Sequence, residues 1–239
     1  MMYGYGYYGY GLDPTVILLV IGMILSLAAS AKLKSTFAVY RKVRNHSGIT
    51  GAEAAQRILR AAGITDVQVV PIRGSLTDHY DPRTKTVNLS ESVFHSTSVA
   101  AIGVAAHECG HAMQDNVGYV PLKLRGAIVP VANIGSQAAF PLIIIGVLIG
   151  GMGSPLVNIG LILFSLAVIF QLITLPVELN ASRRAITLLD QVGILGGQEV
   201  NQTRKVLGAA ALTYVAALAA SVLQLLRLVI LFGGRRDND

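Results

Sequence analysis

Two histidines and a glutamate stand in the pattern H-E-x-x-H at residues 107–111. If this stretch is helical, His107 and His111 share one face and lie one turn apart. Two imidazole nitrogens so placed can bind one Zn²⁺ at about 2.0–2.1 Å. Glu108, beside the first histidine, would point toward a metal-bound water and accept its proton as general base. The pattern therefore predicts zinc-dependent hydrolysis.

The alternative is a pair of polar histidines on a solvated helix face. The neighbouring residues argue against it, because they are apolar almost all round, from Val99 to Ala106 and again at Ala112 and Met113. A buried His-Glu-His cluster without a metal or other partners would be costly. We therefore favour a metal site over a solvated face.

The stretch from Ser98 to Gln114, SVAAIGVAAHECGHAMQ, is expected to be the helix that positions these residues. It is rich in alanine and lacks proline, and Ser96-Thr97-Ser98 is suited to capping its N-terminus. Cys109 is the only cysteine, so no intrachain disulfide is possible. We expect Cys109 to be a small core residue of this helix and neither a ligand nor a nucleophile.

The composition is that of a membrane protein. The chain has 239 residues, of which 53% are hydrophobic and 13% are charged, with a mean hydropathy of +0.58. Its charged fraction is about half that of an average soluble protein. A net charge of +6 can indicate nucleic-acid binding. The basic residues lie instead beside hydrophobic runs, where they set membrane topology, so we expect no nucleic-acid partner.

Three runs carry no charge: residues 14–31, 126–177 and 206–226. About 20 apolar residues cross a bilayer, so the first run is just long enough and the second is long enough for two spans. We place those two near Val131–Ile149 and Leu156–Leu175, with their turn at residues 150–155. The last span continues with an apolar end to Phe232. The fold class predicted is a mostly α, multi-pass membrane protein with about four transmembrane helices.

The spans divide the chain into alternating membrane and polar segments. A Tyr/Gly-rich tail (1–13) precedes the first span (14–31), and a small α+β lobe with the H-E-x-x-H helix follows it (32–125). After the hairpin of two spans (126–177) come a polar segment (178–205), the last span (206–232) and a short tail (233–239).

The basic residues predict the orientation. Sixteen of the 19 lysines and arginines lie in residues 32–125 and 178–205, and the positive-inside bias puts both segments in the cytosol. Ala29-Ser30-Ala31 resembles a signal-peptidase site. No lysine or arginine precedes the first span, however, whereas five lie between residues 32 and 44, directly after it. This distribution favours an uncleaved anchor with its N-terminus outside.

The lobe is expected to contain one amphipathic helix and three extended pieces. These are a helix opened by the capping box Thr50–Glu53 and ended at Gly63, a strand over Thr65–Ile72, and extended pieces Leu76–Tyr80 and Lys85–Ser90 joined by a turn. We expect Lys85–Ser90 to be an edge strand. An exposed edge beside a metal site holds an extended peptide in many peptidases. Ordinary structural cover explains this hairpin equally well.

Glu178 is the leading candidate for a third zinc ligand. It follows Pro176 at the end of the third span, where we expect a new helix to start, and it lies in the same compartment as the H-E-x-x-H stretch. Two histidines and one glutamate leave a fourth zinc position open, as catalytic sites do. A helix-capping carboxylate or an ion pair with Arg183 or Arg184 is the alternative. The other carboxylates, Asp115, Asp190 and Glu199, fit the site less well.

Ser182 stands four residues after Glu178 and shares its helix face. A hydroxyl there can hydrogen-bond a ligand histidine and fix its orientation. Three further groups are candidates for stabilising the oxyanion of a reaction intermediate: Arg183, Arg184 and His79.

Three stretches, AAHECGHAMQ, PVELNASRRA and LTDHYDPRTKTVNLS, resemble the YugP-type neutral zinc metallopeptidases of bacterial membranes. The resemblance runs from about Lys32 to the last span. It implies a membrane-integrated, gluzincin-like zinc peptidase in which His107, His111 and Glu178 are ligands and Glu108 is the catalytic base. More distant membrane gluzincins often carry an aspartate four residues after the ligand glutamate, where this chain has Ser182.

The sequence thus predicts an integral-membrane zinc metalloendopeptidase of the bacterial cell membrane, with its active site facing the cytosol and a peptide or membrane protein as substrate. Two other classes remain: a non-proteolytic scaffold or quality-control protein with a structural zinc site, and a channel or transporter. Channels and transporters usually carry ionisable groups within their spans, whereas residues 14–31, 126–177 and 206–226 carry no charge.

Overall fold

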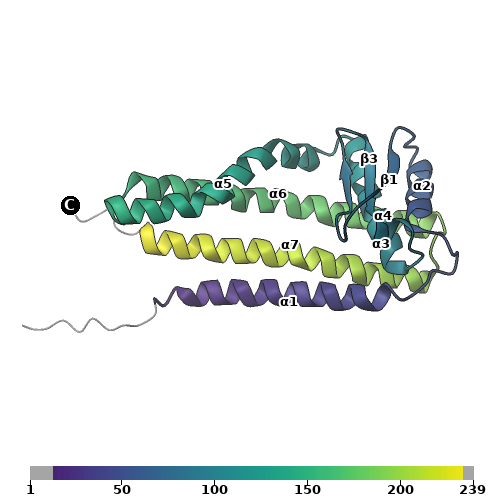
Figure 1. The fold of residues 1–239 in the computed structure, drawn as a ribbon, viewed down its shortest axis with the longest axis horizontal. Coiled ribbons are helices and arrows are strands. Elements are labelled where there is room, and N and C mark those ends of the chain that lie inside the picture. The colour runs from purple at the N-terminus through teal and green to yellow at the C-terminus, as the bar shows by residue number, and fades with distance from the viewer. Residues whose placement is uncertain (1–12, 234–239) are drawn as a thin grey trace, which may run out of the picture.

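The computed structural model describes residues 13–233, in which four long helices stand beside a small mixed lobe (Figure 1). The long helices are α1 (Val16–Tyr40), α5 (Val120–Gly150), α6 (Pro155–Gln191) and α7 (Gly197–Phe232). The lobe contains helices α2 (Gly51–Ala61), α3 (Glu91–Phe94) and α4 (Val99–Asn116), with strands β1 (Gln68–Ile72), β2 (His79–Asp81) and β3 (Thr86–Ser90). Of the predicted tails, only Asp13 of the N-terminal tail and Gly233 of the C-terminal tail belong to the described residues.

The four long helices are each long and apolar enough to cross a membrane. Large apolar side chains are exposed along them, for example Leu148 at 79% and Ile149 at 80%, as expected of a surface that faces lipid. The prediction of a mostly helical protein with about four helices that could span a membrane is confirmed.

Helix α6 corrects one expectation, because no new helix starts after Pro176. Instead, α6 continues through Pro176 and on to Gln191, so Glu178 lies inside a long helix. A proline removes one backbone hydrogen bond, and helices that span membranes tolerate this where their neighbours support the freed carbonyl. Likewise, α1 continues past the two lysines that follow the first uncharged run and ends at Tyr40.

The long helices pack side by side in the order α1, α7, α6, α5. Small residues allow the close approaches in this row. A Cβ added at Gly22 of α1 would lie 3.1 Å from Ala220 of α7, and one at Gly160 of α6 would lie 2.5 Å from Ile143 of α5. Such glycines let backbones approach closely in lipid, where packing rather than the hydrophobic effect holds helices together.

The sheet of the lobe has the strand order β1-β3-β2, with β1 parallel and β2 antiparallel to β3. The expected hairpin is present, but the prediction that Lys85–Ser90 is an edge strand is wrong. That piece forms the central strand β3, whose Val87 and Leu89 are fully buried, and the edge beside the H-E-x-x-H helix is β2. The capping box of α2 is present, with the Glu53 N–H donating to Thr50 Oγ1 at 3.2 Å.

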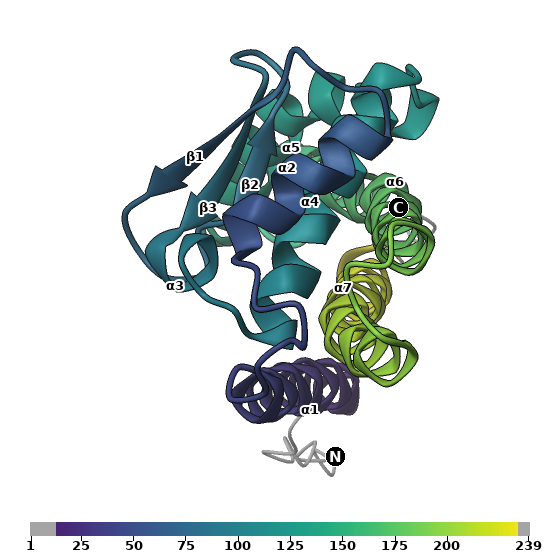
Figure 2. The ribbon, with the colours of Figure 1, turned by 90° about the vertical axis from the view of Figure 1, so that its right-hand side faces the viewer.

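Helix α4 forms the centre of the lobe and lies between α2 on one side and the long helices α6 and α7 on the other (Figure 2). Its N-cap is Ser98, whose hydroxyl accepts from the Ala101 N–H at 3.2 Å. At Gly110 the α4 backbone meets α6, since an added Cβ would lie 2.5 Å from the carbonyl oxygen of Ala181. This contact brings the two histidines of α4 against α6.

Candidate metal centre

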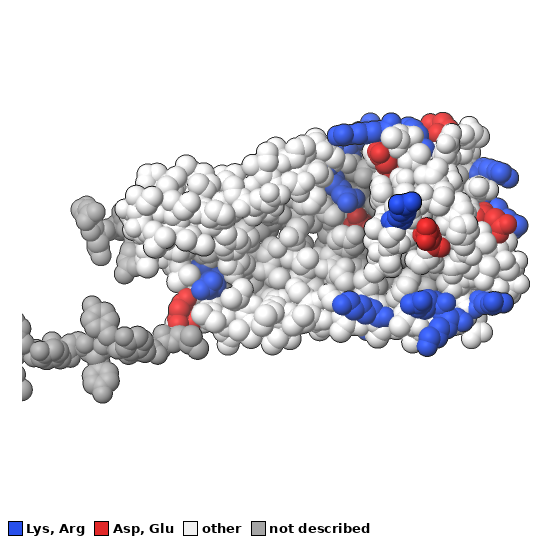
Figure 3. Space-filling view, in the orientation of Figure 1, with Lys and Arg blue, Asp and Glu red and all other residues white. Residues whose placement is uncertain are grey.

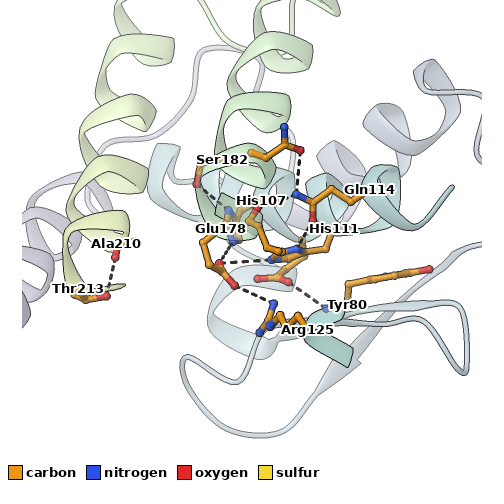
Figure 4. A network of polar contacts seen from close by, with 12 residues as sticks. Tyr80, His107, His111, Gln114, Arg125, Glu178, Ser182, Ala210 and Thr213 are labelled. Carbon is orange, nitrogen blue, oxygen red and sulfur yellow. Dashed lines mark hydrogen bonds and ion pairs between the residues drawn. The ribbon is translucent and has the colours of Figure 1, made fainter. Parts of the chain in front are cut away.

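His107 and His111 of α4 and Glu178 of α6 converge on one point (Figure 4). The Nε2 atom of His107 lies 3.1 Å from Oε2 of Glu178, and that of His111 lies 3.6 Å from the same oxygen. One donor atom from each residue lies within 4.8 Å of the other two. The close contact between the α4 and α6 backbones makes this convergence possible.

Each histidine uses its other ring nitrogen in a contact with a neighbouring side chain. Nδ1 of His107 lies 3.1 Å from Oγ of Ser182, and Nδ1 of His111 lies 3.0 Å from Oε1 of Gln114. A hydrogen bond at Nδ1 fixes the ring and leaves Nε2 free to bind a metal. Two such nitrogens and a buried carboxylate oxygen are donors that Zn²⁺ prefers, so the residues fit this ion.

Gln114 joins the two helices of the site, a role that the sequence analysis did not identify. Its side chain is fully buried, and its Nε2 donates to the Val177 carbonyl at 2.8 Å and to Asn180 Oδ1 at 3.0 Å. Gln114 follows His111 by three residues, a spacing that puts them on neighbouring positions of one helix face. This spacing was the sequence signal from which the contact between Gln114 and His111 could have been predicted.

Arg125 of α5 is the second residue that the sequence analysis missed. Its Nη1 donates to Oε1 of Glu178 at 3.0 Å, so the carboxylate is bonded through both oxygens. Glu178 is 2% exposed, and a buried carboxylate requires such partners. The only sequence signal was that Arg125 is the last charged residue before the long uncharged run.

Glu108 lies beside the three donor residues and is 8% exposed. Its Oε2 accepts a hydrogen bond from the backbone N–H of Tyr80 at 3.1 Å, so the edge strand β2 contacts the predicted base directly. Two cavities reach this carboxylate, and both are also lined by His107, Glu178 and Tyr214 of α7. Glu108 is therefore accessible to a small molecule despite its burial.

Asp115, two turns after Glu108 on α4, makes a second contact with β2 and pairs with Lys85. The Asp115 carboxylate accepts from the Tyr80 hydroxyl at 2.8 Å and from Lys85 Nζ at 2.7 Å. Burial opposes ionisation of Asp115, but the hydrogen bonds from Lys85 and Tyr80 bring its pKa below the ordinary value. The bond to Asp115 raises the pKa of Lys85, and burial together with the Asp115 bond raises that of Tyr80.

The remaining candidates lie at different distances from the centre. His79 lines one of the two cavities, and its Nδ1 lies 2.8 Å from the Thr77 carbonyl oxygen. Arg184 donates to Asn180 at 2.8 Å. The side chain of Arg183 is exposed and makes no hydrogen bond or ion pair within residues 13–233.

The competing carboxylates are used elsewhere or face solvent. Asp115 is bonded to Lys85, Glu199 lies 2.6 Å from His46, and Asp190 is exposed. Cys109 of α4 is fully buried in the core of the lobe. Its burial is the main cause, and the nearby charge of Glu108 the second, of the raised pKa of its thiol. A thiol held protonated in this way is a poor ligand and a poor nucleophile.

The comparisons with known proteins point to a family of zinc peptidases. A family model described as "Putative neutral zinc metallopeptidase" matches residues 15–233. The chain is 49% identical over 224 residues to the "Putative membrane protease YugP" of Bacillus subtilis (strain 168). The matched region covers 94% of this chain and 99% of that relative. No solved structure is significantly similar to the chain.

Proposed function

This chain belongs to the "Putative neutral zinc metallopeptidase" family, and we propose that it is an integral-membrane zinc metalloendopeptidase. The observation that carries the proposal is the convergence of His107, His111 and Glu178 at the end of a cavity. We assign these three as the zinc ligands. Zinc in such a site acts as a Lewis acid on a carbonyl and lowers the pKa of water.

Glu108 is the general base of the proposed reaction. It takes a proton from the attacking water and later gives it to the nitrogen of the leaving amine as the C–N bond breaks. The Tyr80 N–H holds one oxygen of this carboxylate, which restricts its orientation toward the cavity. Ser182 and Gln114 orient the two histidines through their Nδ1 atoms, and Arg125 orients Glu178.

The groups that could stabilise an oxyanion are fewer than the sequence suggested. Of His79, Arg183 and Arg184, only His79 lines a cavity that reaches the centre. The Tyr214 side chain lines both cavities, and its hydroxyl is a hydrogen-bond donor. We assign the stabilisation of the oxyanion to Tyr214 of α7 or to His79 at the start of β2.

The proposed orientation places the lobe and the metal centre in the cytosol. On the face shown in Figure 3, lysines and arginines gather at the lobe end, and the described residues of the opposite half show few charges. Positively charged flanks of membrane spans stay preferentially in the cytosol. In this arrangement the domains follow the predicted order of anchor, cytosolic lobe, hairpin of spans, cytosolic segment around Glu178, and last span.

Zinc content and hydrolysis of an unfolded protein test the proposal together. Purified wild-type protein should contain one zinc per chain and should cleave casein, with loss of cleavage on treatment with a chelator and recovery on adding zinc. His107→Ala should lack both zinc and cleavage. Zinc retained in a wild-type protein that cleaves nothing would instead favour a scaffold with a structural zinc site.

A further inference from the structure

The two cavities at the metal centre differ in the side chains that line them. Both reach His107, Glu108 and Glu178. One cavity also has His79 and Arg125 in its wall, so it offers charged and polar groups to a ligand. The other, which we call the apolar pocket, adds a set of aliphatic side chains to the residues of the centre: Leu76, Val104, Leu207, Ala210 and Ala211.

The apolar pocket lies between one face of α4 and one face of α7. These helices touch at Gly103, where an added Cβ would lie 2.9 Å from Cγ2 of Thr203. Val104, the next residue of α4, precedes His107 by three residues and Glu108 by four, so the three side chains share a helix face. A side chain that enters the pocket therefore lies directly beside a proposed zinc ligand and the proposed base.

The alanines of α7 leave room for one large side chain. The pocket has a volume of about 170 Å³. An apolar cavity of about 150 Å³ holds a benzene molecule, so a phenyl ring fits this space. Ala210 and Ala211 are half-buried, and larger residues at these positions would fill the pocket. The Asp78 carboxylate in the wall accepts hydrogen bonds from Ser90 through both oxygens, so it needs no partner from a ligand.

Leu76 forms part of the rim of the pocket. It lies in the loop between β1 and β2, lines the pocket and is 70% exposed. Its φ of 59° is in the left-handed region, which a bulky residue rarely adopts. Backbone strain of this kind is found at sites that clamp a ligand. An apolar side chain that fills the pocket would cover Leu76 and remove apolar surface from water.

We propose that the apolar pocket selects the substrate residue on one side of the scissile bond and takes a large apolar side chain there, such as phenylalanine or leucine. Ala210 and Ala211 set the size that the pocket accepts, and Leu76 covers the bound side chain. This inference rests on the proposed peptidase function and adds a sequence preference to it.

Matched peptides test the preference. The sites cut in casein define the flanking position, and two peptides built on the site that is cut fastest carry phenylalanine or alanine there. Wild-type protein should cleave the phenylalanine peptide with a kcat/KM about tenfold or more higher, since a hydrophobic pocket discriminates about 10-fold to 200-fold even for one methylene group. Ala211→Leu fills the pocket and should lower this ratio about tenfold.

Ala217→Leu is the matched control. Ala217 is an exposed alanine of the same helix and lines neither cavity within the described residues, so its replacement should leave the ratio unchanged. A general loss of activity lowers both rates and keeps their ratio. An unchanged ratio in Ala211→Leu, or a wild-type protein without a preference at either flanking position, would overturn the inference. The peptidase function would stand in both cases.

Leu76→Asn tests the rim separately. Asparagine adopts the left-handed conformation readily, so the loop keeps its backbone while the apolar cover is lost. The ratio of the two rates should fall about threefold or more, because less apolar surface is buried around the phenyl ring, with the Tm unchanged. An unchanged ratio would show that Leu76 does not cover the bound side chain.

A binding measurement does not depend on catalysis. N-acetylphenylalanine hydroxamate and N-acetylalanine hydroxamate have the same metal-binding group and differ only in the side chain. Calorimetry with zinc-loaded protein should show about tenfold or more tighter binding of the phenylalanine compound, and Ala211→Leu should abolish the difference. Equal affinities, or binding of neither compound, would overturn the inference. If the difference is found but wild type cleaves no casein, the peptidase function fails and the pocket stands.

Discussion

Arg125 and Glu178 form an ion pair, with Nη1 of Arg125 lying 3.0 Å from Oε1 of Glu178. The other oxygen of the same carboxylate faces His107 at 3.1 Å. The two oxygens thus have different partners. Because Arg125 binds Oε1, Oε2 is the oxygen left to face the histidines and a metal ion. Arg125 lies in α5 just before the predicted span, so this helix contributes to the orientation of a proposed ligand in another helix.

The first prediction concerns this pair. Arg125→Gln should weaken zinc binding or lower activity by about 10-fold to 100-fold, the usual effect of removing a partner of a metal ligand. Arg125→Lys should recover part of the loss because it keeps the charge but not the planar donor. Chelator competition measures the zinc affinity. Arg183→Gln is the matched control, since Arg183 is exposed and unpaired in the described residues. Equal effects of Arg125→Gln and Arg183→Gln would remove Arg125 from the site.

The second prediction identifies the third ligand. Glu178→Ala should sharply reduce the zinc content of the purified protein, because two histidines alone hold the ion weakly. Asp115→Ala and Glu199→Ala should retain zinc, since these carboxylates are bonded to Lys85 and His46. Elemental analysis of the three variants decides the question. Full zinc content in Glu178→Ala, with loss in either of the others, would show that the assignment is wrong.

The third prediction concerns stability as a function of pH. The lowered pKa of Asp115 means that its charge stabilises the fold above its unfolded pKa of about 3.9 and that this contribution fades as pH falls through the folded value. The raised pKa of Lys85 means that its contribution is complete below about pH 10.4 and is lost as pH rises further. Asp115→Asn keeps a partner for the Tyr80 hydroxyl and removes only the charge.

The Tm of Asp115→Asn should therefore fall below that of wild type between these limits, by a degree or two, since partly exposed pairs contribute roughly 1 kcal/mol or less. The difference should shrink as the pH falls below about 3.9. Asp66→Asn is the control, because Asp66 lies 3.9 Å from Lys85 and its side chain is 64% exposed. A difference that persists unchanged at pH 3 would mean that the charge of Asp115 is not its cause.

The fourth prediction concerns topology. In a Cys109→Ala background, an impermeant thiol reagent added to intact cells should label a cysteine at Met152, in the turn between α5 and α6, and should not label one at Arg60 of α2. Both positions are exposed in the structure. The reagent should label Arg60→Cys after the membrane is permeabilised. Labelling at position 60 in intact cells would place the lobe outside.

Much of the metal centre was predictable from sequence because its signals are local. The spacing of His107 and His111 specifies one helix face, and the uncharged runs specify four spans. Glu178 followed from its position at a membrane boundary. Ser182 followed from its spacing to Glu178, and the structure places its hydroxyl against His107.

The residues that were missed depend on how the elements pack. Arg125 contacts Glu178 because α5 packs against α6, and Tyr80 contacts Glu108 because β2 lies beside α4. Gln114 joins the two helices of the site because α4 lies against α6. The alternation of apolar and polar residues along one strand does not encode the order of the strands in a sheet. The strand β3 was therefore expected at an edge, although it lies in the centre. A proline usually ends a soluble helix, but Pro176 lies inside α6, which is long and apolar enough to span a membrane, and such helices tolerate proline. The order in which the four long helices pack has no sequence pattern of its own.

The most direct test of the proposed function is hydrolysis of casein by Glu108→Gln compared with wild type, both with measured zinc content. The glutamine has a similar size and keeps an acceptor for the Tyr80 N–H, but it cannot take a proton at neutral pH. We predict a rate at least about a hundredfold lower, with zinc content and Tm unchanged. Cleavage by Glu108→Gln at the wild-type rate would contradict the role of Glu108 and, with it, the metallopeptidase mechanism.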